Sequence, residues 1–277
     1  MEGTIPVTGL ARQIAQTFVG ARRQATAVRA YPGDLPPDLE TGYAIQEQAI
    51  SLRSDAIAGW KIGRIPPVWV EKLGAERLAG PIFSRLVWPS RASEDVAFPV
   101  YDGGFAAVEA EFVFRLGADA PPEKTSWTTE EASALVAALH IGVELAGSPL
   151  ATINALGPPV VVSDFGNNHG LILGPDIPNW RARRDEDMTC ETFIDGQSVG
   201  RGSAASVLGG PLSSLVFLLE HTAKRGRPLK VGQLVSTGAA TGIHDIAIGQ
   251  HARVSFGALG EIQCAAERAT PRLGELV

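Results

Sequence analysis

The chain has 277 residues, of which 45% are hydrophobic and 19% are charged, and its formal net charge is -6. This composition predicts a folded protein with one large domain, or one main domain with a small helical appendage, and it excludes extensive disorder. The negative charge argues against a nucleic-acid partner, because such partners usually bind a basic patch. An anionic substrate would therefore need a local cation to attract it.

Neither a membrane partner nor a disulfide is expected. The first residues have no positively charged region followed by an apolar one, and no apolar run approaches the length of a membrane span. The two cysteines, Cys190 and Cys264, lie far apart and show no ligand-like spacing to histidine, so we interpret them as buried thiols in a reducing compartment. We expect a cytoplasmic protein.

The first 57 residues are predicted to form a helical region. Apolar residues recur at helical spacing over residues 8–28, and a second helix is predicted over residues 37–53, where proline suits the first turn. From residue 58 the pattern changes to short apolar runs separated by glycine and proline. This change predicts a strand-rich core over residues 58–277, beginning with a short strand at 59–63.

Two glutamates separated by a single residue, Glu109 and Glu111, lie in the run 108–116, whose alternating apolar residues predict a strand. Side chains alternate across a strand, so these two carboxylates point to the same face and repel each other unless a cation or a proton lies between them. Alone, the pair is typical of a solvated strand face. A third glutamate, Glu144, lies in a strand-like stretch at 139–145, and three hard oxygen ligands suit Mg²⁺ or Mn²⁺.

The rest of the core is predicted from local signals. A capping box at Thr128 predicts a helix that ends near Ala138. Residues 160–163 and 171–173 are expected to be strands on either side of a polar loop. We also expect a hairpin with an Asp-Gly turn at 195–196.

Toward the C-terminus, Pro211 opens a predicted helix that ends near Gly226. Three strands are expected after it, at 232–237, 252–256 and 261–264. The order of helices first, followed by many strands with two inserted helices, indicates an α+β fold with a mixed sheet and not a regular βαβ repeat.

Several motifs in the sequence have simpler structural interpretations. The Gly-x-Ser-x-Gly pattern at 196–200 lies in the predicted hairpin, so we reject it as a nucleophile elbow. The segment 238–242 lacks the lysine of a phosphate-binding loop and predicts a tight turn. His169, in the polar loop, is the one histidine considered for function. Lys61 lies in an apolar run, where burial would depress its pKa toward neutrality, although a strand lysine that reaches solvent is the simpler alternative.

From about residue 43 to the C-terminus the chain resembles the fumarylacetoacetate hydrolase superfamily, in its 2-keto-4-pentenoate hydratase and 4-oxalocrotonate decarboxylase branch. The segments that carry the resemblance are the second helix at 43–46, the Gly-Trp-Lys-Ile-Gly segment at 59–63, the two-glutamate strand at 109–112, the third-glutamate strand at 143–145, the polar loop at 164–174 and the strand and turn at 232–242.

The resemblance implies a fumarylacetoacetate hydrolase-like core, a mixed sheet rolled toward a barrel, with the helical region before it, and a homo-oligomer. It also implies a site for Mg²⁺ or Mn²⁺ and a small anionic 2-oxo or 2-hydroxydienoic acid. The residues it assigns are Glu109, Glu111 and Glu144 to the metal, Lys61 and Asp164 to catalysis, and Arg85, Asn168 and Thr237 to the substrate.

The implied reaction is hydration of a 2-hydroxy-2,4-dienoate or 2-oxo-3-enoate to a 4-hydroxy-2-oxo acid, as in meta-cleavage degradation of aromatic compounds. Lys61 would move protons and Asp164 would orient the substrate or a water molecule. A 4-oxalocrotonate-type decarboxylase or an acylpyruvate hydrolase could use the same metal-enolate site. A non-catalytic partner subunit is the alternative of another class.

Three departures from the branch bear on these alternatives. Residues 147–149 read Gly-Ser-Pro where relatives usually carry Asp-Ser-Arg, and Asp164 is followed by phenylalanine where asparagine is usual. Arg85 lies where an acidic residue is frequent. These departures suggest altered chemistry or a changed tail-group preference, and those at 147–149 and Arg85 favour a partner subunit. The intact Lys61 and the three glutamates favour an enzyme.

Overall fold

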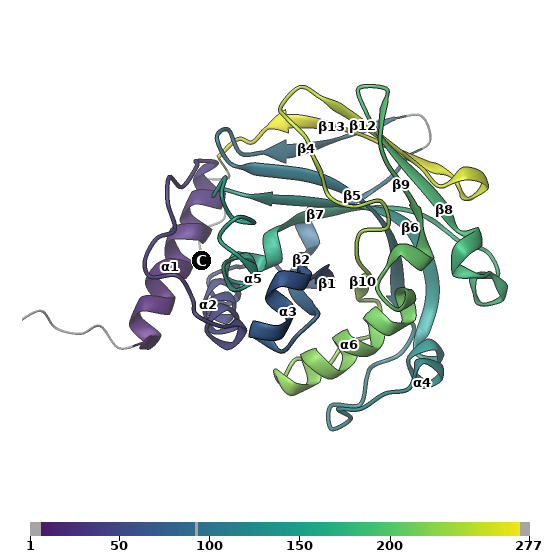
Figure 1. Ribbon diagram of the computed structural model, residues 1–277, viewed down its shortest axis with the longest axis horizontal. Helices are drawn as coiled ribbons and strands as arrows, with labels where there is room; N and C mark the ends of the chain where they lie inside the picture. Colours follow the sequence, from purple (N-terminus) through teal and green to yellow (C-terminus); the bar gives the residue numbers. More distant parts are fainter. Residues whose placement is uncertain (1–6, 92–93, 272–277) are drawn as a thin grey trace, which may run out of the picture.

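Two helices, α1 (Val7–Gln24) and α2 (Leu39–Ser51), begin the computed structural model, which describes residues 7–91 and 94–271. They pack side by side at one end of the molecule (Figure 1). The α2 helix is capped by Asp38, whose carboxylate accepts a hydrogen bond from the backbone N–H of Thr41 at 2.8 Å. Both predicted helices are confirmed, with α1 ending before Ala25, which takes a left-handed φ of 53°.

The larger sheet has eight strands and mixes parallel with antiparallel pairs. Its strands, in spatial order, are β2 (Arg77–Phe83), β1 (Ile57–Arg64), β10 (Leu234–Ser236), β5 (Phe105–Leu116), β6 (Val136–Ser148), β7 (Asn168–Asp176) and β3 (Val87–Pro89), with β11 (His244–Asp245) paired to β5. The β1–β10 and β3–β7 pairs are parallel. Figure 1 shows that this sheet curls around the interior of the molecule.

The smaller sheet has five strands and covers the outer side of the larger one (Figure 1). In order they are β4 (Asp95–Val100), β13 (Glu261–Arg268), β12 (His251–Ser255), β8 (Thr189–Ile194) and β9 (Gln197–Ser203). Phe112 of β5 meets Phe256 at the end of β12 edge-to-face, with ring centroids 5.6 Å apart. The predicted Asp-Gly turn joins β8 to β9, and both Asp195 and Gly196 have positive φ, as a tight hairpin turn requires.

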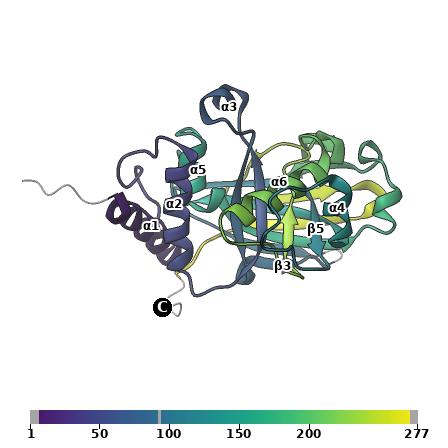
Figure 2. The same ribbon diagram turned by 90° about the horizontal axis from the view of Figure 1, so that it is seen from below.

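Four further helices are α3 (Pro67–Leu73), α4 (Thr129–Ala134), α5 (Pro158–Ser163) and α6 (Gly210–Lys224). The capping box at Thr128 is confirmed, although α4 ends at Ala134 and β6 starts two residues later. Figure 2 shows α3 projecting from the molecule, in agreement with its lack of buried residues. No helix in the described ranges is both long and apolar enough to cross a membrane.

The prediction of a strand at 160–163 was wrong, because these residues belong to α5. Pro158 and Pro159 supply helical φ angles at positions whose N–H groups need no intrahelical partner. The helix is buried throughout, so its sequence is apolar on every side and has no period that separates helix from strand. It packs so tightly on α2 that a Cβ at Gly42 would lie 2.5 Å from the Pro159 carbonyl oxygen.

Candidate metal centre

Three buried carboxylates form the centre of the candidate site. Glu109 and Glu111 lie two residues apart on β5, and Glu144 stands opposite Glu109 on the antiparallel strand β6. One oxygen from each carboxylate lies within 4.8 Å of the others. Like charges directly opposite each other on a sheet are destabilising, so this cluster requires a proton or a cation between its members.

Glu111 is held in place from β10 and the turn after it. Its Oε2 accepts hydrogen bonds from the hydroxyl of Ser236 and from the backbone N–H of Gly238, the latter at 3.0 Å. Its Oε1 is buried and has no hydrogen-bond partner among the described residues. A buried carboxylate oxygen without a partner is costly unless a ligand completes its surroundings.

Glu144 has the same arrangement of one paired and one unpaired oxygen. Its Oε1 accepts from the Nδ2 of Asn168 at 3.1 Å and lies 3.1 Å from the Nζ of Lys61. Its Oε2 is buried without a hydrogen-bond partner in the described parts of the chain. Hard, buried and partly unsatisfied oxygens are the ligand set that a divalent cation such as Mg²⁺ prefers, so these residues fit a metal ion.

Burial and mutual repulsion change the acidity of the cluster. Burial, assisted by the charge of Glu144 and opposed by Lys61, raises the pKa of Glu109 to about 7. Burial and the charges of Glu144 and Glu109 raise the pKa of Glu111 well above its ordinary value, although its hydrogen bonds oppose the shift. Without a cation, part of the cluster therefore carries protons at neutral pH.

Lys61 lies on β1 and is 3% exposed. Its ammonium group donates to the Gly166 carbonyl at 3.1 Å and to the Asn167 Oδ1 at 3.0 Å, and it pairs with Glu144. The expectation of a depressed pKa was wrong. Burial alone lowers it, but the nearby carboxylates, led by Glu144, outweigh burial and raise the pKa of Lys61 above its ordinary value.

The loop that faces Lys61 has an unusual backbone. Phe165, Gly166 and Asn167, the residues of a short 3₁₀ turn, all have positive φ, which non-glycine residues adopt at an energetic cost. The turn lies against β2 so closely that a Cβ at Gly80 would come within 1.9 Å of the Phe165 carbonyl oxygen. This fixed conformation presents both of the loop oxygens that bind Lys61.

A cavity of about 580 Å³ adjoins the cluster. Lys61, Glu109, Asn167 and Thr237 line it. Thr237 is held by a hydrogen bond from its hydroxyl to the Phe112 carbonyl at 2.8 Å. The structure thus brings one carboxylate that is predicted to bind the metal, the buried lysine and a predicted substrate-binding residue to one cavity of a size suited to a small acid.

Curated proteins similar to this chain are named as hydratases and decarboxylases. A TodF product hydratase of Pseudomonas putida is 27% identical over 95% of this chain and 97% of its own. A 2-keto-4-pentenoate hydratase of Burkholderia vietnamiensis is 26% identical over 84% of this chain and 87% of its own. A 4-oxalocrotonate decarboxylase from a Pseudomonas species is 26% identical over 83% of this chain and 87% of its own. No protein-family model matches the chain.

The solved structure of 4-oxalocrotonate decarboxylase from Pseudomonas putida G7, complexed with magnesium and adipate, superimposes with a TM-score of 0.76. It is 20% identical in sequence, and the match covers 92% of this chain and 97% of that one. These relatives are the hydratases and decarboxylases that the resemblance seen in the sequence led us to expect. The predicted α+β fold and the enzymatic character of the family are confirmed.

Asp164 lies in an ion-pair cluster and not on the wall of the 580 Å³ cavity. The guanidinium of Arg22 on α1 donates from Nε to Asp164 Oδ1 at 2.7 Å and from Nη2 to Oδ2 at 2.9 Å. Ser148 donates to the same carboxylate at 2.6 Å. The catalytic role of Asp164 stays a prediction, and its geometry favours a part in positioning the polar loop.

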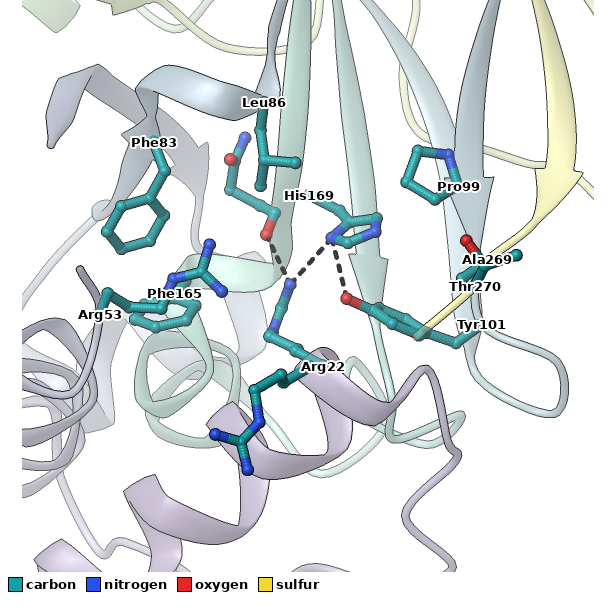
Figure 3. Close-up of a pocket in the computed structure, with 12 residues that line it drawn as sticks. Arg22, Arg53, Phe83, Leu86, Pro99, Tyr101, Phe165, His169, Ala269 and Thr270 are labelled. Atoms are coloured by element: carbon teal, nitrogen blue, oxygen red, sulfur yellow. Dashed lines mark hydrogen bonds between the residues drawn. The ribbon is translucent and has the colours of Figure 1, made fainter. Parts of the chain in front are cut away.

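Figure 3 shows the other side of this cluster, where Arg22 reaches from its helix toward His169. Its Nη1 lies 3.1 Å from the His169 Nδ1 and donates to the Asn168 carbonyl at 3.2 Å, and the Tyr101 hydroxyl lies 3.2 Å from the same histidine nitrogen. Sequence reasoning missed Arg22. The available signal was its place four residues after Phe18 on the buried stripe of the first helix.

Arg85 is not brought to the cavity. Its side chain is exposed, and its backbone N–H donates to Asp55 at 3.0 Å. The arginines that line the cavity are instead Arg64, Arg77 and Arg201, none of which was predicted. Asn168 is buried and holds Glu144 in place, and it does not line the cavity.

Proposed function

We propose that this protein is a divalent-metal-dependent enzyme that adds water to a 2-hydroxy-2,4-dienoate or 2-oxo-3-enoate and forms a 4-hydroxy-2-oxo acid. The buried cluster of three glutamates beside Lys61 is the observation that carries the proposal, because two of its carboxylate oxygens have no partner in the described residues. The names of two hydratase relatives support the same substrate class.

Glu109, Glu111 and Glu144 would hold the cation, for which Mg²⁺ or Mn²⁺ is the natural choice for oxygen ligands. Bound there, it would supply Lewis-acid stabilisation of negative charge on the C2 oxygen of a 2-oxo acid. Two related structures support this assignment, since one is complexed with magnesium and adipate and another with Mn²⁺ and pyruvate.

The residues around the cluster have distinct roles in this proposal. Lys61 holds a proton at Nζ on the cavity wall and would deliver it to the substrate carbon during ketonisation. Gly166 and Asn167 fix the direction of that ammonium group. Asn168 orients Glu144. Thr237, which lines the same cavity as Lys61, would contact the substrate.

Decarboxylation of a 4-oxalocrotonate-type acid is the second candidate. It is supported by the similarity to a named decarboxylase over most of the chain. Loss of CO₂ needs the same stabilisation of enolate charge. Acylpyruvate hydrolysis has weaker support, because it also needs a base to activate water, and no histidine of the described residues lines the cavity.

The proposal is tested by incubating the purified protein with 2-hydroxypenta-2,4-dienoate and Mg²⁺ while the loss of dienol absorbance is followed. We expect turnover by the wild type, and a decrease of about 100-fold or more in Lys61→Met, as for loss of a general acid. Mg²⁺ binding should persist in Lys61→Met but be lost in Glu144→Gln. Glu130→Gln, at an exposed position on α4, serves as the control.

Absence of turnover in the wild type, or equal turnover in the wild type and Glu144→Gln, would contradict the hydratase proposal. Release of CO₂ from 2-hydroxyhexa-2,4-dienedioate without water addition would favour the decarboxylase instead.

A further inference from the structure

The ammonium group of Lys61 has an acceptor for each of its N–H groups. An ammonium group has three donors and no acceptor. Those of Lys61 face the Gly166 carbonyl at 3.1 Å, the Asn167 Oδ1 at 3.0 Å and the Glu144 Oε1 at 3.1 Å. Gly166 contributes backbone and Glu144 belongs to the carboxylate cluster. Of these three partners, Asn167 therefore holds Lys61 by a side chain that lies outside the cluster.

The shape of the Asn167 side chain does not determine which end of its amide faces Lys61. The oxygen and the NH₂ group are nearly the same size, and the terminal torsion of asparagine has a broad, roughly two-fold preference. Burial alone therefore leaves both orientations open, although Asn167 is only 4% exposed. With the NH₂ group toward Lys61, two donors would oppose each other. Hydrogen bonds must select the orientation that Lys61 needs.

Asn154 supplies the hydrogen bond at the other end of this amide. Its Oδ1 accepts from the Nδ2 of Asn167 at 3.0 Å. Because Lys61 can only donate, the direction of both hydrogen bonds is determined, from Lys61 to Asn167 and from Asn167 to Asn154. Asn154 is exposed and lines the same cavity as Lys61. It can therefore be changed without loss of a buried contact of its own.

The turn over residues 151–156, between β6 and α5, holds Asn154 in place. The neighbouring side chain of Ile153 is fully buried in the core. The Asn154 carbonyl accepts from the backbone N–H of Gly157 at 3.3 Å. A Cβ at Gly157 would lie 2.8 Å from the Cζ2 of Trp69, so the turn is also packed against the indole of α3. These contacts give Asn154 a fixed position from which it can orient Asn167.

We propose that Asn154 is a positioning residue, which holds the Asn167 amide with its oxygen toward Lys61 and so aims the ammonium group for proton transfer. This inference rests on the proposed function, in which Lys61 delivers a proton to the substrate. Asn154 acts through Asn167 and not through the substrate. Its loss should therefore slow the chemical step and leave substrate binding nearly unchanged.

The first test is the steady-state kinetics of two variants with 2-hydroxypenta-2,4-dienoate and Mg²⁺. Asn154→Leu has a similar size but no acceptor, and we expect its kcat to fall by about 10-fold with little change in KM. Asn154→Asp keeps an acceptor oxygen and should retain most of the wild-type kcat. Thr152→Val, at an exposed position of the same turn, is the matched control. Because both positions are exposed, the melting temperatures should stay close to that of the wild type.

The second test needs no substrate. In the ¹⁵N-labelled protein, nuclear magnetic resonance measures the exchange of the Asn167 side-chain amide protons with solvent, and the resonance is identified by its loss in Asn167→Asp. A hydrogen-bonded amide proton exchanges slowly. We expect faster exchange in Asn154→Leu than in the wild type, and slow exchange in Asn154→Asp and Thr152→Val.

An unchanged kcat in Asn154→Leu, or a loss that Asn154→Asp does not restore, would overturn this inference while the proposed function stands. A raised KM with an unchanged kcat would also overturn it, because Asn154 would then act on the substrate itself. Absence of turnover in the wild type would refute the proposed function. The exchange rates still test the orientation of Asn167 in that case, and equal rates in the wild type and Asn154→Leu would refute it as well.

Discussion

Glu109 and Glu144 face each other across two antiparallel strands, and this pairing determines how the metal-free protein responds to pH. Burial and the neighbouring charge raise the pKa of Glu109 to about 7. The folded protein therefore holds a proton on this residue that the unfolded chain releases nearer its ordinary pKa of about 4.5. As the pH rises from about 4.5 to about 7, the Glu109 carboxyl therefore lowers the free energy of unfolding progressively.

From this relation we expect the melting temperature of the metal-free protein, kept so by a chelator, to fall by several degrees between pH 5 and pH 7.5. Glu109→Gln should show a shallower decrease, since its amide does not titrate. Mg²⁺ should raise the melting temperature more at pH 7.5 than at pH 5, because protons compete with the cation for the carboxylates. Thermal melts by circular dichroism measure all three. Parallel pH profiles for the wild type and Glu109→Gln would contradict the assignment.

At the scale of elements, the Arg22–Asp164 ion pair joins α1 to the loop between α5 and β7. Both side chains are buried, and the guanidinium also lies over the ring of Phe165, 5.3 Å from its centroid. Removal of one partner from a buried pair leaves an uncompensated charge, which costs more than the pair itself contributes.

Arg22→Met is therefore expected to lower the free energy of unfolding by about 3–5 kcal/mol, as measured by urea denaturation. The double variant Arg22→Met/Asp164→Asn should recover part of this loss, and Arg12→Met on the exposed side of the same helix should cost little. A cost below about 1 kcal/mol in Arg22→Met would show that the pair contributes little to stability.

The folded double variant also tests the predicted catalytic role of Asp164. Turnover reduced by about 100-fold would support direct action on the substrate. Turnover close to that of the wild type would show that Asp164 only positions the loop.

At the scale of the whole molecule, the helical region and the strand-rich core share buried hydrogen bonds. Gln46 of α2 donates to the carbonyls of Ala79 and Val162 at 3.1 and 2.9 Å. The Tyr43 hydroxyl accepts from the backbone N–H of Ala79 at 2.9 Å. The division at residue 57 stays a prediction from sequence, and these contacts argue that the two regions fold together.

We accordingly expect the full chain to unfold in a single cooperative transition by near-ultraviolet and far-ultraviolet circular dichroism. A fragment of residues 58–277 should fail to give native near-ultraviolet signals. It would lack Arg22, which pairs with Asp164, and Gln46, which donates to two buried carbonyls of the core. A fragment that melts cooperatively would contradict this.

Light scattering of the intact protein would test the predicted homo-oligomer.

The sequence by itself determined the features that depend on neighbouring residues. The two-residue period of a strand put Glu109 and Glu111 on one face, the capping box at Thr128 began a helix, and Asp195-Gly196 formed the hairpin turn. Local conformational preference is sufficient for each of these, because the interacting groups lie within a few residues of one another.

Only the tertiary structure decided the rest. The apolar run of α5 suited a helix or a strand equally, and packing on all sides selected the helix. The pKa of Lys61 rises and does not fall, because the curled sheet brings carboxylates from β5 and β6 to a lysine on β1. Arg22 pairs with Asp164 across 142 positions of sequence. Coulombic interaction and burial depend on distances in space, and sequence periodicity carries no record of those distances.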